Sequence, residues 1–128
     1  MARGLGSRVH FEVGDLERAP LSDESFDAVI SNGAFCLVPH KPVAFQEMFR
    51  LLKPGGRFYF DEVTAAALAT RGYRWLFDHP TEDRFTASEF VAELERQGLQ
   101  VGSRWRTRVR GHYLLGVAQR PYSDAAPR

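Results

Sequence analysis

Residues 9–64 decide the fold, and they read VHFEVGDLERAPLSDESFDAVISNGAFCLVPHKPVAFQEMFRLLKPGGRFYFDEVT. This stretch contains three short apolar runs: VHFEV at 9–13, FDAVI at 26–30 and RFYF at 57–60. Each run ends in polar or acidic residues, namely Gly14-Asp15, Ser31-Asn32 and Asp61-Glu62. Open parallel sheets bind ligands outside the carboxyl ends of their strands. The stretch therefore predicts three strands and a small-ligand site along one edge of their sheet.

A helix is expected between the second and third strands. Apolar side chains recur at three- and four-residue steps over Lys41–Leu52, which is typical of a helix with one buried face. The segment Lys53-Pro54-Gly55-Gly56 ends it, because proline cannot continue a helix and glycine readily turns the chain back. The apolar run at 26–30 predicts a central, buried strand.

The remainder of the chain predicts two more helices and a closing hairpin. We expect helices at Ala65–Phe77 and Ala87–Gln97, the second with Thr86 and Glu89 as a capping box. Strands follow at about 100–109 and 112–119, and the order of elements indicates an α/β sheet with an antiparallel element at one edge. Arginines at 104, 106, 108 and 110 alternate with Trp105, Thr107 and Val109, which predicts arginines outward and Trp and Val inward. Residues 121–128 are expected to be a disordered tail.

Composition narrows the class of partners. The chain has 128 residues, 44% hydrophobic and 26% charged, as in ordinary globular domains. Seventeen basic and sixteen acidic residues leave +1, so charge favours neither nucleic acid nor another polyanion. The single cysteine, Cys36, excludes an internal disulfide and a cysteine-built metal cluster, and no metal is expected. Apolar runs are far shorter than the roughly 20 residues of a membrane span, so we expect no membrane partner and a cytoplasmic location.

Taken together, KPGGRFYF, VGDLERAP and SFDAVISN resemble the class I S-adenosylmethionine-dependent methyltransferases. The resemblance is to the small-molecule branch, methyltransferase type 11, with arsenite, ubiquinone-type and sterol-type enzymes. It covers residues 9–64 through motifs and 86–119 through element order. It implies a Rossmann-like sheet whose last two strands form a hairpin, S-adenosylmethionine as cofactor, and methyl transfer to a small molecule.

The resemblance also implies site residues. Asp15 corresponds to an acid that hydrogen-bonds the adenine amine, and Leu16 to a residue that contacts the same ring. Ser31, Asn32 and Gly33 correspond to the strand end that faces the methionine part of the cofactor. Asp15 can alternatively be a turn acid, and Ser31-Asn32 a turn.

Candidates for the acceptor pocket follow in the same way: Phe35, Cys36, His40, Asp61 and Glu62. Four of these five have an alternative. Cys36 can be a small buried hydrophobe, His40 a surface loop residue, and the two acids can cap the next helix. No catalytic residue is assigned, because direct displacement requires mainly positioning and exclusion of water.

Two features depart from the family pattern. Its glycine-rich turn and the acid that holds the ribose have no counterpart before Val9, so residues 1–120 resemble a partial domain that is N-terminally truncated, without the first two strands. Gly33 stands where the arsenite enzymes carry a metalloid-binding cysteine, and Cys36 lies three residues further on, which argues against arsenite chemistry.

Two functions therefore stay open. The first is methyl transfer as part of a complete domain, and whether these 128 residues are active alone is undecided at this point. The second is a non-catalytic remnant, or a fragment with a misassigned start, that acts through association with another chain. Exposed strand edges would then favour self-association.

Overall fold

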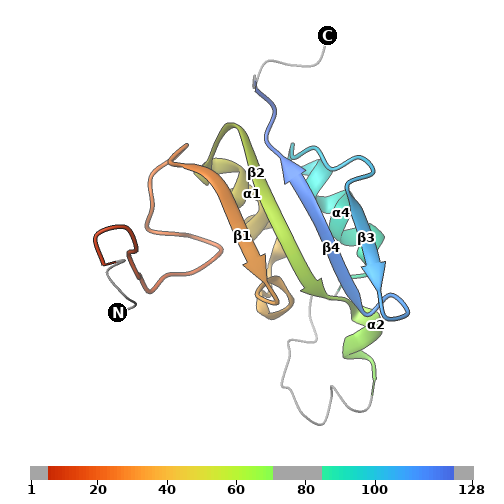
Figure 1. The fold of residues 1–128 in the computed structure, drawn as a ribbon. Coiled ribbons are helices and arrows are strands. Elements are labelled where there is room, and N and C mark those ends of the chain that lie inside the picture. Colours follow the sequence, from red (N-terminus) through yellow and green to blue (C-terminus); the bar gives the residue numbers. More distant parts are fainter. Residues whose placement is uncertain (1–5, 71–84, 123–128) are drawn as a thin grey trace.

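The computed structural model describes residues 6–70 and 85–122, which form a four-stranded mixed sheet with helices on one face (Figure 1). Its strands lie in the order β1-β2-β4-β3. β1 and β2 are parallel, whereas β4 runs antiparallel to both of its neighbours. The elements are β1 (Phe26–Asn32), η1 (Phe35–Leu37), α1 (Lys41–Leu51), β2 (Leu52–Val63), α2 (Ala65–Leu68), α4 (Ala87–Arg96), β3 (Trp105–Arg108) and β4 (Tyr113–Gln119). The predicted α/β class and closing hairpin are confirmed.

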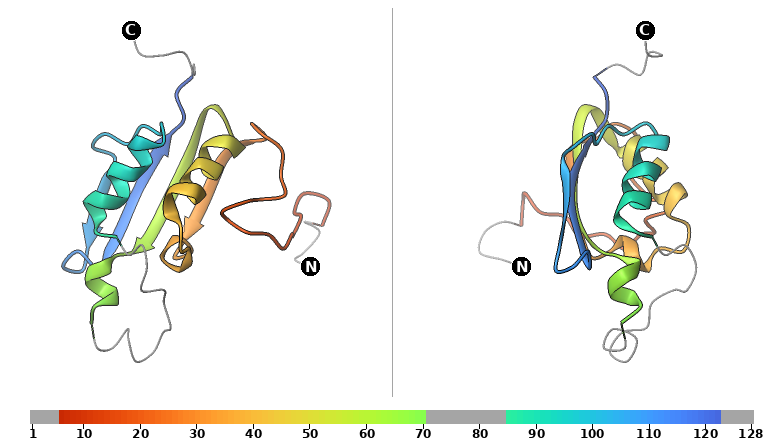
Figure 2. Two further views of the ribbon diagram at one scale, coloured as in Figure 1. Left: turned by 180° about the vertical axis from the view of Figure 1, so that it is seen from behind. Right: turned by 90° about the vertical axis from the view of Figure 1, so that its right-hand side faces the viewer.

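The core lies between the sheet and helices α1 and α4, which pack on the same face (Figure 2). Successive side chains of a strand point to opposite faces, so Phe58 and Phe60 point together into this core. The rings of Phe45 from α1 and Phe90 from α4 meet edge to face, with centroids 4.8 Å apart. Burial of the apolar side chains of this core is the main stabilising term of the fold, and the aromatic contacts add to it.

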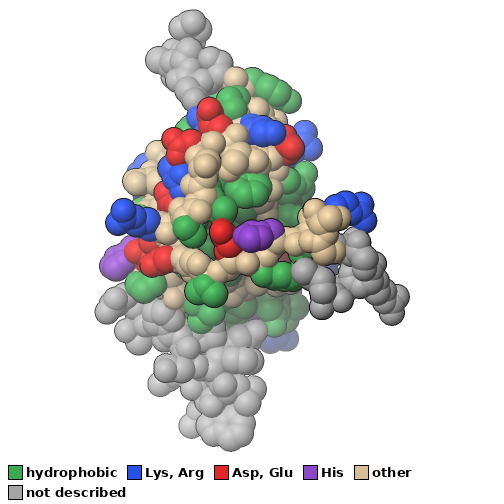
Figure 3. Space-filling view, turned by 90° about the vertical axis from the view of Figure 1, so that its left-hand side faces the viewer, with side chains coloured by type: hydrophobic (Ala, Val, Ile, Leu, Met, Phe, Trp, Pro, Cys, Tyr) green, Lys and Arg blue, Asp and Glu red, His purple; other side chains and the backbone are tan. Residues whose placement is uncertain are grey.

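The opposite face of the sheet carries no helix within residues 6–70 and 85–122 (Figure 2). Tyr59 on this face is exposed, and Ile30 is 78% exposed. Figure 3 views the molecule from the side of β1 and the amino-terminal segment, and hydrophobic side chains reach the surface there among charged ones. One sheet face and one strand edge are therefore open to solvent or to a partner.

The predicted strand at 9–13 is wrong. These residues form no strand, and Val13 is 98% exposed. β1 is likewise an edge strand with mostly exposed residues, not the central buried strand that its composition suggested. A strand needs a neighbour for its backbone groups, and high β propensity cannot replace one. Figure 1 shows the amino-terminal segment standing away from the sheet.

Two of the predicted helices are confirmed. α1 begins at Lys41 and ends at Leu51. α4 has the expected capping box, since the Thr86 amide donates to Glu89 Oε1 at 2.8 Å and the Glu89 amide to Thr86 Oγ1 at 3.2 Å. The third, α2, starts at Ala65 as predicted but ends at Leu68, and residues 71–77 lie outside the described part. No helix in the described part is long and apolar enough to cross a membrane.

The closing hairpin is shorter at β3 than predicted. Gln100 forms only an isolated bridge with Gln119, and the strand begins at Trp105. Trp105 packs half-buried against the core as expected, but Val109 is exposed, because it lies in the turn with a positive φ of 51°. Arg104 donates to the carbonyl of Gln100 at 2.7 Å, so this arginine of the series forms a structural hydrogen bond to the backbone. Of the predicted tail, residues 123–128 lie outside the described part.

The segment after α1 forms an irregularity at the start of β2. β1 advances from Phe26 to Ala28 while β2 advances from Leu52 to Arg57, so the intervening residues bulge out of the pairing. Gly55 has a φ of +81°. A Cβ on Gly56 would lie 2.9 Å from the Lys53 carbonyl, which belongs to the backbone and cannot move aside.

We predict that Gly55→Val and Gly56→Val each lower the free energy of unfolding by at least about 1–2 kcal/mol, because the first forces a β-branched residue into left-handed backbone and the second clashes with backbone. Chemical denaturation measures this. Arg57→Val, at an exposed position of the same strand, serves as the control and should change stability little. Wild-type stability in both valine variants would contradict the bulge.

Candidate functional site

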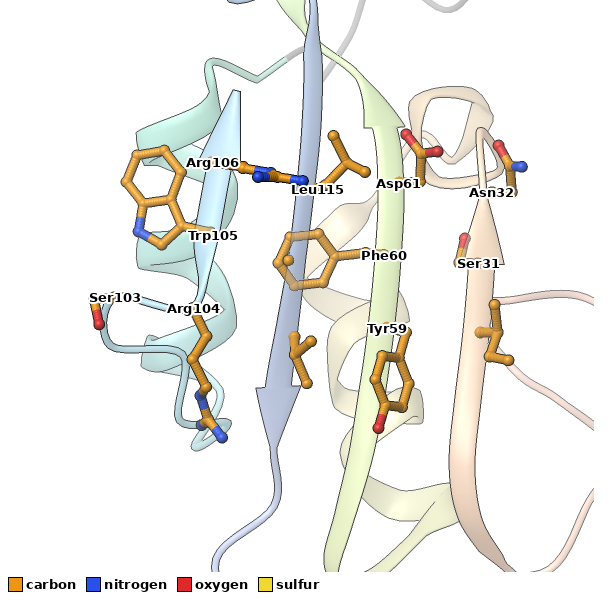
Figure 4. Close-up of a pocket in the computed structure, with 13 residues that line it drawn as sticks. Ser31, Asn32, Tyr59, Phe60, Asp61, Ser103, Arg104, Trp105, Arg106 and Leu115 are labelled. Carbon is orange, nitrogen blue, oxygen red and sulfur yellow. The ribbon is translucent and has the colours of Figure 1, made fainter. Parts of the chain in front are cut away.

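The carboxyl ends of β1 and β2 meet at one edge of the sheet because the two strands are parallel. Asn32 and Asp61 are partners in the register there, and the Gly33 amide donates to the Asp61 carbonyl at 2.7 Å. Leu115 of β4 and Arg106 of β3 continue the same row. Figure 4 shows this row across the four strands. An amide, a carboxylate and a guanidinium thus lie along one line.

A hollow of about 620 Å³ lies on the uncovered face of the sheet beneath this row (Figure 4). Its walls combine apolar side chains with the polar groups of the row, as small-molecule sites do. The lining residues include Ile30, Ser31, Asn32, Tyr59, Asp61, Trp105 and Arg106.

A second groove of about 390 Å³ runs between β1 and α1. Leu16, Phe35 and Met48 contribute to its apolar lining. Ser31 and Asn32 line both spaces, and they therefore mark the junction of the groove with the hollow. Of the cofactor residues expected from the sequence, Leu16, Ser31 and Asn32 are brought together here.

Asp15 takes a different position from its neighbour Leu16. Its side chain is exposed, and Oδ1 accepts a hydrogen bond from the Glu17 amide at 2.8 Å. Its carbonyl accepts from the Arg18 amide at 3.0 Å, which closes a turn. The acid thus shapes the loop that carries Leu16 into the groove.

Arg50 of α1 anchors this loop. Its guanidinium donates to the carbonyls of Leu21 at 2.8 Å and Ala19 at 3.1 Å, and it pairs with Asp23 at 2.6 Å. It also bonds Glu47, whose pKa is lowered chiefly by this hydrogen bond. The position of the loop that carries Leu16 therefore depends on Arg50, which lies 34 residues after Leu16 in the sequence, on α1.

Two of the three residues of η1, Phe35 and Cys36, turn inward, whereas Leu37 is exposed. The Phe35 ring is 1% exposed and packs in the core, 5.3 Å from the Phe45 ring between centroids. Cys36 is buried, and its thiol donates to the Gly33 carbonyl at 3.1 Å. Burial raises the pKa of the Cys36 thiol, which disfavours the thiolate that a metalloid would bind. Gly33 has a φ of +66°, where a cysteine would be strained.

His40 lies outside both spaces. It is the exposed N-cap residue of α1, and its Nδ1 lies 3.1 Å from Glu17 Oε1. The structure thus places His40 at the surface, as the alternative interpretation of it expected. Within the described residues, no group of three or more His, Cys, Asp or Glu side chains could hold a metal ion.

Glu62 is the fully buried acid of the described part, and it neither lines the hollow nor caps α2. Its Oε2 accepts from Ser31 Oγ at 2.9 Å, and its Oε1 accepts from the amides of Phe35 at 2.8 Å and Cys36 at 3.3 Å. Burial raises its pKa to about 7, against the lowering effect of these hydrogen bonds. Glu62 therefore caps the first turn of η1.

Sequence reasoning missed Tyr59 and Arg106 as residues of the hollow. Tyr59 lies two positions before Asp61 on the same strand, and alternation alone puts both on one face. Arg106 could be placed only by knowing that β4 lies between β2 and β3, which is a non-local pairing.

We predict that Glu62→Gln changes the pH dependence of stability. The folded pKa of about 7 exceeds the ordinary 4.5, so the wild type loses stability as pH rises between these values, by up to about 3 kcal/mol. Glutamine removes that loss, and the variant should gain relative to wild type between about pH 5 and about pH 8 in thermal unfolding. Glu89→Gln is the control with the opposite sign, because the pKa of Glu89 is lowered. A difference in stability between Glu62→Gln and wild type that does not change with pH would contradict the raised pKa of the buried Glu62 carboxyl group.

Comparison with known proteins identifies relatives. Residues 1–60 match the family described as a methyltransferase domain. An arsenite methyltransferase of Aquipseudomonas alcaligenes is 45% identical over 56 residues, which are 44% of this chain and 16% of that protein. A malonyl-[acyl-carrier protein] O-methyltransferase of Enterobacter lignolyticus is 30% identical over 126 residues, or 97% of this chain. The chain spans 46% of that relative's length.

The fold agrees with the sequence matches. A SAM-dependent methyltransferase of Methanosarcina mazei superimposes with a TM-score of 0.68 at 20% identity, covering 88% of this chain and 68% of the other. Such a match shows the fold alone, and it is the Rossmann-like sheet that the sequence predicted. The sequence matches and the fold together support a class I S-adenosylmethionine-dependent methyltransferase, a family whose cofactor is S-adenosylmethionine.

Proposed function

We propose that the carboxyl edge of β1 and β2 binds S-adenosylmethionine and that the protein, as part of a complete domain, transfers its methyl group to a small-molecule acceptor. The observation that supports this most is the convergence of Leu16, Ser31 and Asn32 at the junction of the groove and the hollow. These are residues that the family resemblance assigns to the cofactor.

The donors present fit the cofactor in part. Leu16 offers an apolar surface for the adenine ring, and the exposed Asp15 carboxylate offers an acceptor for its amine. The carbonyls at the end of β1, from Ser31 and Asn32, would face the methionine part. S-adenosylmethionine supplies an electrophilic methyl group when bound, so the protein's task is to orient the acceptor and exclude water.

We place the acceptor in the hollow on the uncovered sheet face. Asp61 is the acceptor-pocket candidate whose side chain lines this space, whereas Phe35, Cys36 and Glu62 are buried and His40 lies outside. Asp61 can accept a hydrogen bond from an acceptor hydroxyl or amine, and Arg106 can donate to an acidic group. A small molecule with a hydroxyl, amino or acidic group can hydrogen-bond to these two side chains. A metalloid would instead require an exposed thiolate.

We predict that Asp15→Ala weakens binding of S-adenosylhomocysteine by roughly 1–3 kcal/mol, because the adenine amine loses its acceptor. Isothermal titration of the full chain measures this. Asp15→Asn is the matched control for loop shape: its oxygen still accepts from the Glu17 amide, but its amide group cannot accept from adenine. Wild-type affinity in both variants would remove Asp15 from the site, and absence of binding by the wild type would sink the proposed function.

A second candidate function is non-catalytic association with another copy of the chain. It is favoured by the open outer edge of β1 and by the exposed apolar side chains of Phe11, Val13 and Ile30. An unpaired edge presents a row of backbone donors and acceptors to which a second β1 can pair. A continuous sheet across two copies would also cover Ile30.

We predict that the chain self-associates in a concentration-dependent manner and that Ile30→Lys shifts it to the monomer, because an edge charge opposes strand pairing. Size-exclusion chromatography with light scattering measures the mass. Val43→Lys is the control, since Val43 is exposed on α1, away from the edge. A wild type that stays monomeric at all concentrations tested would contradict the association.

A further inference from the structure

We propose that Glu62 is a positioning residue: its buried carboxylate holds η1 against the end of β1, so that Ser31, Asn32 and Gly33 keep the arrangement that the site requires. What these residues bind rests on the proposed function. The holding of the loop does not, and the two can be tested separately.

The geometry joins three segments through one side chain. Glu62 comes from β2, Ser31 from the end of β1, and the amides of Phe35 and Cys36 from the start of η1. The two carboxylate oxygens have different partners: Oε2 accepts a hydrogen bond from Ser31 Oγ, and Oε1 accepts from the amides of Phe35 and Cys36. Within residues 6–70 and 85–122, no lysine or arginine forms an ion pair with Glu62, so its partners are these hydrogen-bond donors.

An internal acceptor is required at this place. The first amides of a helical turn have no partner within the turn. The ring of Phe35 is packed in the core, so the amide of the same residue cannot turn toward water. A buried amide without an acceptor is destabilising, and Glu62 is the side chain that reaches it.

The effect of losing Glu62 should be local. Gly33 keeps its bond to the Asp61 carbonyl, which continues the pairing of β1 with β2. Beyond it, the turn is closed by the Val38 amide, which donates to the Phe35 carbonyl at 3.1 Å, and by the Cys36 thiol on Gly33. None of these contacts ties the Phe35 amide to the sheet. Removal of the carboxylate therefore releases η1 while the strands remain paired.

Amide hydrogen exchange by NMR on the full chain tests the holding step. Glu62→Ala should speed exchange at Phe35 and Cys36 by about tenfold or more relative to core amides of β2. Glu62→Gln should restore protection, because one amide oxygen can still accept both bonds and its NH₂ can donate to Ser31 Oγ. Thr64→Val is the matched control: it removes the hydrogen bond from Thr64 Oγ1 to the Gly111 carbonyl, directly after the same strand, and should leave these two amides unaffected.

Equal protection of the Phe35 and Cys36 amides in Glu62→Ala and wild type would overturn the proposal, as would a Glu62→Gln variant that exchanges as fast as Glu62→Ala. Should Glu62→Ala fail to fold, Glu62→Met replaces it, because it fills a similar volume without an acceptor.

Titration with S-adenosylhomocysteine separates this inference from the proposed function. We expect Glu62→Ala to weaken binding and Glu62→Gln to retain it. A wild type that binds none would defeat the proposed function, while hydrogen exchange would still decide the role of Glu62 in the loop. Unchanged affinity in a Glu62→Ala protein whose loop is released would overturn the positioning role.

Discussion

The hydrogen bonds of the Glu62 carboxylate hold together the part of the molecule on which the site depends. Parallel pairing brings the ends of β1 and β2 to one edge, but the chain must then leave β1 and return through α1. Glu62 fixes the first step of that return by binding Ser31 and the start of η1. Burial of a carboxylate opposes folding, and the three donors and the packed ring of Phe35 offset it.

The elements that the sequence predicted correctly have local causes. The capping box of Thr86 and Glu89 and the apolar face of α1 depend on residues that are close together in the sequence, and both formed as expected. The strand at 9–13 failed because a strand depends on a neighbour, which no local pattern reveals. The role of Glu62 could not be predicted either, since it depends on which non-local amides surround a buried acid.

In the candidate site, too, the features with local causes could be predicted from the sequence and those with non-local causes could not. Strand ends were sufficient to predict that Ser31, Asn32 and Asp61 would share an edge, because parallel strands end together. The inward rotation of Phe35 and Cys36 required the tertiary structure. The polar edge agrees with the match to a methyltransferase domain, whereas the open sheet face and the free edge of β1 account for the proposed association.

The central claim is that the carboxyl edge of β1 and β2 is a binding site for the cofactor. Titration of the isotope-labelled full chain with S-adenosylhomocysteine, followed by amide chemical shifts, tests it most directly. The account predicts saturable shifts concentrated at Leu16, Ser31, Asn32 and Gly33, with the amides of α4 unaffected. Shifts confined to other surfaces, or no shifts at all, would contradict it.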